Sequence, residues 1–132
     1  MYLLDTNTCI QFLNGTSPAV KDQFQQHAAR DLVLCSVVKA ELLFGARKSQ
    51  RTESNLLTLD RFFKAFKSLT FDDRSAEEYG QIKALLAVQG NLIGPNDLMI
   101  AAIARAHDAT LVTNNTGEFS RVTGLRLEDW QA

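Results

Sequence analysis

The sequence is poor in residues that would cross-link the chain, bind zinc or cross a membrane. It holds two cysteines and two histidines among 132 residues, and no apolar run approaches the ~20 residues that a membrane-spanning helix needs. Cys9 and Cys35 lie among apolar neighbours, with no second Cys or His close by in sequence, so we expect two buried thiols rather than a disulfide or a zinc site. These absences predict one cytoplasmic domain, residues 1–132, with no membrane segment.

The chain also lacks the excess of basic residues that is typical of nucleic-acid binding proteins. Its 14 Lys and Arg stand against 15 Asp and Glu, which gives a formal net charge of −1. If the four acids discussed below serve as metal ligands, the remaining residues carry a net charge of +3, and the bound cations themselves attract phosphate. Net charge therefore does not exclude a nucleic-acid substrate.

Short apolar runs alternate with helical patterns along the whole chain. Strand-like runs occupy residues 2–4, 32–35, 69–71, 110–113 and 125–127. Between them, Pro18 follows a capping serine at the first helical position, and Ser36 can cap a helix that runs to about Lys48. The stretch NNTGEF after the fourth run has the composition of a polar loop. The alternation predicts an α/β fold, an α/β/α sandwich with a mostly parallel sheet of four or five short strands.

Four acidic residues stand where such a sheet gathers ligands, outside the carboxyl ends of its strands. Asp5 ends the first strand in YLLDTNT, Asp97 opens a helix after Pro95, and Glu118 follows the strand at 110–113. Glu41 lies inside a helix among apolar neighbours, where a carboxylate is costly unless a cation is nearby.

A carboxylate set without His or Cys suits Mg²⁺ or Mn²⁺, and such a cage is a common apparatus for phosphodiester cleavage. Each acid also has a simpler interpretation. Asp97 alone is an ordinary helix cap, Glu118 a solvated loop residue, and Asp5 a turn former. The joint placement of the acids, rather than any one of them, indicates a metal site.

Four stretches resemble, in order and approximate spacing, the PIN-domain ribonucleases, and among them the VapC-type toxins of toxin–antitoxin pairs. They are LLDTNTCI, SVVKAELLFGARKS, GPNDLMIAAIARAHDATLVTNNTGEF and RVTGLRLEDW, and together they span essentially the whole chain. The resemblance implies a PIN-like sandwich and an endoribonuclease that uses Mg²⁺ or Mn²⁺, with tRNA as a candidate substrate.

The resemblance also implies roles for the site residues. Asp5 and Asp97 would bind the ion directly, and Glu41 would bind a second ion or position the attacking water. Asn115 stands where many PIN proteins have a fourth Asp, so Glu118 is the substitute candidate. Four further residues would hold the site in place, Thr6 and Asn7 by steadying Asp5, together with Thr113 and Asn115. Gly117 stands where close relatives often carry an Arg.

Partners follow from the same resemblance. A VapB-type antitoxin would lay a peptide into an apolar groove and place an Arg against the acids, within an assembly that contains a toxin homodimer. The candidate groove residues are Leu42, Leu43, Phe44, Leu57, Phe62 and Phe66. The candidate RNA-binding cations are Lys39, Arg47, Lys48, Arg51, Arg105 and Arg121.

Two alternatives remain at this point. Asn115 is consistent with a catalytically degenerate PIN-like module that binds RNA or protein. The LLDTNT stretch also resembles the D-x-D-x-T loop of haloacid-dehalogenase-type phosphatases, although Asn7 replaces the acid that would protonate the leaving group.

Overall fold

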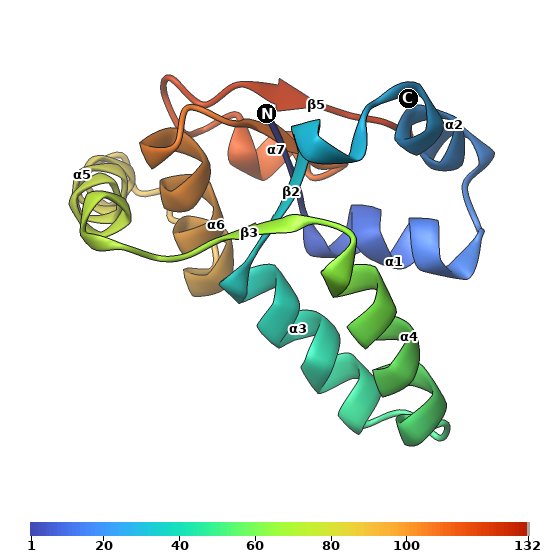
Figure 1. Ribbon diagram of the computed structural model, residues 1–132. Coiled ribbons are helices and arrows are strands. Elements are labelled where there is room, and N and C mark those ends of the chain that lie inside the picture. Colours follow the sequence, from blue (N-terminus) through green and yellow to red (C-terminus); the bar gives the residue numbers. More distant parts are fainter. Residues whose placement is uncertain (132) are drawn as a thin grey trace.

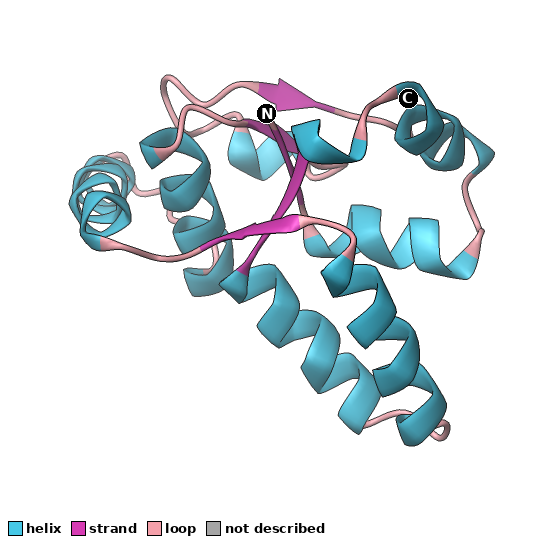
Figure 2. Cartoon of the chain, in the orientation of Figure 1, coloured by secondary structure: helices cyan, strands magenta, loops and turns pink. Residues whose placement is uncertain are grey.

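The computed structural model describes residues 1–131, which form a five-stranded sheet surrounded by helices (Figures 1 and 2). The strands are β1 Tyr2–Leu4, β2 Leu32–Cys35, β3 Lys67–Leu69, β4 Thr110–Val112 and β5 Leu127–Glu128. The α-helices are α1 Thr6–Asn14, α2 Pro18–Gln26, α3 Ser36–Arg47, α4 Thr52–Lys64, α5 Asp73–Val88, α6 Pro95–Ala106 and α7 Thr116–Phe119, and a 3₁₀ turn covers Ala29–Asp31.

All strand pairs are parallel, and the strand order is β3-β2-β1-β4-β5. From β1 the chain therefore adds β2 and then β3 on one side of the sheet, and it then crosses back to add β4 and β5 on the other side of β1. Because such crossovers are right-handed, the reversal puts α1 to α4 on one face of the sheet and α5 to α7 on the other (Figure 1). This confirms the predicted sandwich. It also opens a crevice between the carboxyl ends of β1 and β4, where ligands bind in sheets of this type.

The central strands are apolar because helices cover both of their faces. All four residues of β2 are buried, and so are the last two residues of β4. Helix α6 packs against β4 and α5, and its alanines Ala101, Ala102 and Ala104 are fully buried, since small side chains allow close approach. This packing fixes the first turn of α6, which carries Asp97, beside the sheet edge.

Several local expectations were shifted or wrong. The third strand begins at Lys67, two residues earlier than predicted. Ser36 does not cap α3; it is the first helical residue, and its hydroxyl donates to the carbonyl of Leu69 at 3.5 Å. The NNTGEF stretch ends in the short helix α7 rather than remaining a loop, because Phe119 is 1% exposed and anchors it in the core.

Other expectations hold. Cys9 and Cys35 are buried free thiols, and burial raises the pKa of both. Across residues 1–131, no helix has the length and apolar character needed to cross a membrane.

Helices α3 and α4 pack along each other and project from the rest of the molecule (Figure 2). Phe62 of α4 is 7% exposed and its ring lies 5.1 Å from that of Phe66 and 5.9 Å from that of Phe12. Phe62 is therefore a core residue, not the groove wall that the sequence suggested. Its neighbour Leu57, by contrast, is exposed.

Candidate active site

A cavity of about 180 Å³ lies at the crevice between the ends of β1 and β4. It is lined by Asp5, Thr6, Asn7, Glu41, Asp97, Ile100, Asn114, Asn115 and Phe119. Three of the four candidate acids therefore share one cavity, although they are separated by up to 92 positions in the sequence. The fourth, Glu118, lies beside it and is joined to the lining residue Asn115 by a hydrogen bond.

Asp5 is buried at the end of β1, and hydrogen bonds fix both its side chain and its backbone. Its side chain is the N-cap of α1 and accepts a 2.8 Å hydrogen bond from the backbone N–H of Thr8, while its own N–H donates to the carbonyl of Val112 in β4. Only 6% of Asp5 is exposed, and this burial raises its pKa. Hydrogen bonds from Thr113 and Thr8 oppose that rise, and the negative charge of Glu41 adds to it.

Glu41 reaches the cavity from α3 and is held by neutral donors. The hydroxyl of Thr6 donates to Oε1 at 2.6 Å, and the amide of Asn96 donates to Oε2 at 3.4 Å. Within residues 1–131 no salt bridge involves Glu41, so the neighbouring cation that the sequence calls for is not a basic side chain. The carboxylate is half-buried at the cavity rather than enclosed among apolar side chains, so hydrogen bonds are sufficient. Thr6 thus holds Glu41, whereas the sequence suggested that it would steady Asp5.

Asp97 occupies the third position of α6, where the helix amides favour a negative charge. Even so, its pKa is raised to about 6. Burial is the main cause, followed by the negative charges of Glu118, Glu41 and Asp5. All four acids therefore interact at the N-terminus of α6.

Glu118 is fixed by the segment after β4. The amide of Asn115 donates to Oε2 of Glu118 at 2.8 Å, and the backbone N–H of Asn115 donates to the hydroxyl of Thr113 at 3.0 Å. Sequence reasoning missed Asn96, whose amide contacts Glu41, and Asn114, which lines the cavity. The neighbouring asparagines in Asn96-Asp97 and in the T-N-N stretch were the available signal.

A divalent cation fits the chemistry of this site. The donors are oxygens, and in the described chain none of the four salt bridges reaches Asp5, Asp97, Glu41 or Glu118. Burial, and then the negative charges of the other three acids, raise the pKa of Asp97. Within residues 1–131, however, no three His, Cys, Asp or Glu side chains already stand in an arrangement that would hold an ion. Thr6, Asn96 and Asn115 instead occupy oxygens of the two glutamates.

Two of the cations suggested for RNA have structural partners instead. Arg105 forms a 2.6 Å ion pair with Glu78 of α5. Arg121 donates to the carbonyls of Asn91 and Leu92 at 3.3 Å. Both arginines tie segments on the α5–α6 side of the molecule together.

The sequence matches the PIN domain over residues 2–125, so the chain belongs to the PIN-domain family. It is 43% identical over 129 residues to the tRNA(fMet)-specific endonuclease VapC of Shigella flexneri, covering 98% of this chain and 97% of that protein. It is 40% identical, with the same coverage, to ribonuclease VapC2 of Haemophilus influenzae. Within the family, the chain is thus of the VapC ribonuclease type, as its motifs indicate.

Solved structures agree with this assignment. DNA-bound VapBC from Salmonella typhimurium superposes with a TM-score of 0.91 at 38% identity, covering 98% of this chain and 97% of the other. VapBC2 from Rickettsia felis, bound to a DNA fragment from its promoter, gives a TM-score of 0.89 at 36% identity and 98% coverage of both chains. The phosphatase alternative loses its basis, because the match to the PIN domain extends over nearly the whole chain.

Proposed function

We propose that the chain is the toxin of a VapBC-type pair, a cytoplasmic endoribonuclease that hydrolyses RNA, with tRNA as the substrate class, and that requires Mg²⁺ or Mn²⁺. The observation that carries the proposal is the convergence of four carboxylates at the reversal point of the sheet, where in residues 1–131 no basic side chain neutralises them. The tRNA(fMet)-specific endonuclease at 43% identity supports the substrate class, and the ribonuclease at 40% identity supports RNA as the substrate.

Each acid has a proposed role. Asp5 and Asp97 bind the ion, Asp5 in an orientation set by the N–H of Thr8. Glu41 accepts a proton from the attacking water or binds a second ion, and the hydroxyl of Thr6 fixes its position. Glu118, steadied by Asn115, completes the negative charge around Asp97. When bound, the ion would lower the pKa of a water molecule and neutralise charge on the phosphate oxygens.

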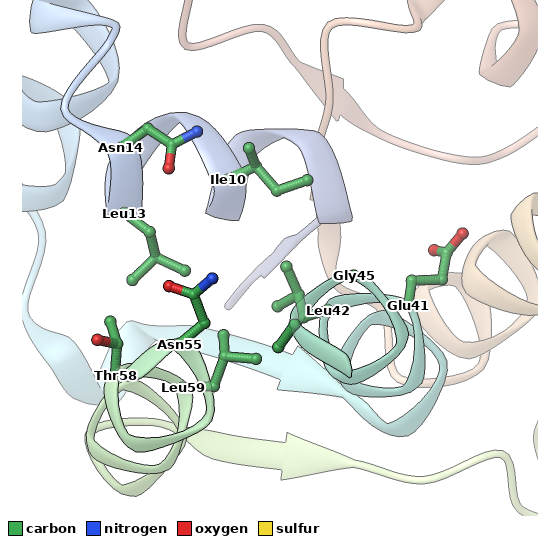
Figure 3. A pocket seen from close by; sticks show the side chains of 10 residues that line it. Ile10, Leu13, Asn14, Glu41, Leu42, Gly45, Asn55, Thr58 and Leu59 are labelled. Atoms are coloured by element: carbon green, nitrogen blue, oxygen red, sulfur yellow. The ribbon is translucent and has the colours of Figure 1, made fainter. Parts of the chain in front are cut away.

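The antitoxin would dock in a second cavity of about 370 Å³ between α1, α3 and α4 (Figure 3). Its lining is Ile10, Leu13, Asn14, Glu41, Leu42, Gly45, Ala46, Asn55, Thr58 and Leu59. Of the six groove residues suggested by the sequence, only Leu42 lines it. Glu41 stands at the edge of this set and also lines the acidic cavity (Figure 3). A peptide in the groove would therefore end beside the acids, where an Arg would pair with them. The VapBC complexes among the solved relatives support such a partner. The proposed assembly also contains a toxin homodimer.

Cleavage of total tRNA by the purified protein, free of antitoxin, tests this function. We expect cleavage with Mg²⁺ or Mn²⁺, none with EDTA, and none from Asp5→Asn or Asp97→Asn. Asp22→Asn, which changes an exposed acid on α2, is the matched control and should retain full activity. Equal cleavage by wild type and Asp5→Asn would assign the activity to a contaminant. Metal-independent binding of RNA without cleavage would instead favour the degenerate module, for which Asn115 is the one supporting feature.

A further inference from the structure

We propose that Phe44 is a stacking platform for an unpaired base of the RNA substrate, next to phosphate contacts made by Lys48, Arg47 and Arg51. This inference rests on the proposed ribonuclease function and adds to it a residue that selects single-stranded RNA near the cut.

Phe44 is exposed to an unusual degree. It is 65% exposed on α3, more than any other aromatic residue in the part of the chain that the structure describes. The ammonium group of Lys48 lies 5.0 Å from the centre of the ring and covers it from one side. An aromatic ring with an adjacent cation is the usual combination in proteins that bind unpaired nucleotides, since bases stack on the ring and phosphates pair with the cation.

Helix geometry places this pair beside the acids. Phe44 comes three residues after Glu41, and Lys48 comes seven residues after it. Because an α-helix turns by 100° per residue, both side chains lie close to the face of α3 that carries Glu41. Lys48 is roughly 10 Å along the helix from Glu41, about three stacked nucleotides. A strand whose scissile phosphate lies at the acids would therefore reach both Phe44 and Lys48.

Phe44 is also separate from the proposed antitoxin groove. Leu42 and Gly45 turn to one flank of Glu41 and line that groove, whereas Phe44 turns to the other flank and is not among its lining residues. A peptide seated in the groove leaves Phe44 uncovered. The helix surface is thus divided by Glu41 into two sides.

Charge identifies RNA as the occupant of the Phe44 side. Between positions 36 and 52, Glu41 is the single acid, while Lys39, Arg47, Lys48 and Arg51 are basic. Within residues 1–131, none of these four cations forms a salt bridge. The ammonium group of Lys39 lies 5.1 Å from the centre of the Phe63 ring of α4 and points away from Phe44, so the cations on the Phe44 side are Arg47, Lys48 and Arg51. The net charge of +3 in this segment contrasts with −1 for the whole chain, and it matches a phosphate backbone rather than an apolar peptide.

Binding of a labelled, unstructured oligoribonucleotide to full-length protein tests the platform. The background is Asp5→Asn in EDTA, so that the RNA is not cut, and the readout is fluorescence anisotropy. Phe44→Ala and Phe44→Leu should each weaken binding about 5- to 150-fold, equivalent to ~1–3 kcal/mol, whereas Phe44→Trp should retain it. Lys48→Gln should lower the salt dependence by about 0.7 in the log–log slope. Leu57→Ala, an exposed apolar change on α4, is the control and should bind as the background does.

Wild-type affinity in Phe44→Leu would overturn the proposal, because an apolar but non-aromatic side chain would then suffice. Unchanged RNA binding by Phe44→Ala would also overturn it. This holds even if that variant loses antitoxin binding or changes its oligomeric mass. Cleavage assays separate the two hypotheses. If wild type cleaves tRNA and Phe44→Ala does so with unchanged KM, the platform fails and the ribonuclease stands; if wild type does not cleave, the ribonuclease fails.

Discussion

Replacing Asp97 with Asn should make the metal-free protein more stable at neutral pH while it removes the nuclease activity. In the folded chain the pKa of Asp97 is raised from its ordinary value of 3.8 to about 6, by burial and by the nearby charges of Glu118, Glu41 and Asp5. The ionised carboxylate is therefore less favourable in the folded state than in the unfolded state. Asn has nearly the same shape and no charge, so the substitution removes that cost.

The magnitude follows from the size of the pKa change. A change from 3.8 to about 6 corresponds to about 3 kcal/mol if it is taken in full. Asp97 is only half-buried, so solvent screening reduces this to about 1.5 kcal/mol. The variant also loses a favourable charge at the N-terminus of α6, which costs about 0.5 kcal/mol. A net gain of about 1 kcal/mol remains, equivalent to roughly 4 °C in Tm.

The sign of the pH dependence is fixed by the raised pKa. The destabilising charge is fully present above the folded pKa of about 6, declines as the pH falls toward 3.8, and is absent below that. Urea unfolding in EDTA should therefore find Asp97→Asn more stable than wild type at about pH 8 and equal to it near pH 4. Asp22→Asn should match wild type at both. Added Mn²⁺ should stabilise wild type but not Asp97→Asn, by mass action. A variant that is less stable at about pH 8, or a gain that persists at low pH, would refute the idea that burial and the neighbouring acids make the ionised Asp97 unfavourable in the folded chain.

Three further substitutions have distinct expected outcomes. Gly45→Ala should raise the free energy of unfolding by about 0.5–1 kcal/mol in urea melts, because Gly is a poor helix former and a Cβ at this position meets no atom within 4 Å. The added methyl group should also weaken binding of an antitoxin peptide in the groove that Gly45 lines. An unchanged free energy of unfolding would contradict the helix argument. Thr6→Val should lower kcat about 10-fold with little change in KM, because the hydroxyl that donates to Glu41 is lost. Thr6→Ser keeps a hydroxyl and should retain the wild-type kcat. Equal kcat values in the Val and Ser variants would exclude this role of the hydroxyl. Phe62→Ala should lower the free energy of unfolding by about 3–5 kcal/mol, whereas Leu57→Ala should change it by less than about 0.5 kcal/mol. Similar losses in both variants would contradict the assignment of Phe62 to the core.

The sheet could be predicted because its signals are local. Two-sided burial makes a strand apolar throughout, so the run at 32–35 matched β2 at both ends. β3 was harder to place, because Lys67 and Ser68 are polar and only Leu69 is buried in it. Helix α7 was missed for a similar reason: its order depends on burial of Phe119 against distant elements, which no local pattern of TGEF reveals.

The candidate acids could be chosen from the sequence, but their partners could not. Strand ends and helix starts are local features, and the sheet rule brings them to one edge without knowledge of the contacts. The hydrogen bond from Thr6 to Glu41 joins residues 35 positions apart, and its direction depends on how α1 and α3 pack. Asn96 was overlooked for the same reason. Buried and exposed apolar residues of the α3–α4 pair could not be told apart in the sequence, as Phe62 and Leu57 show.

Under the proposed roles, the position of Glu41 would let one helix, α3, contact the reacting phosphate, the RNA and an inhibitor. Its carboxylate borders both the acidic cavity and the groove between α1, α3 and α4, and on the opposite flank it is followed by Phe44 and Lys48. If the proposed roles hold, an inhibitor in the groove would not need to cover the flank that carries Phe44 and Lys48, because displacing or neutralising Glu41 would be sufficient to stop the reaction. Inhibition should therefore reduce kcat more than it reduces RNA affinity. An antitoxin peptide that instead abolishes RNA binding to the Asp5→Asn protein would mean that the two flanks of α3 are not independent.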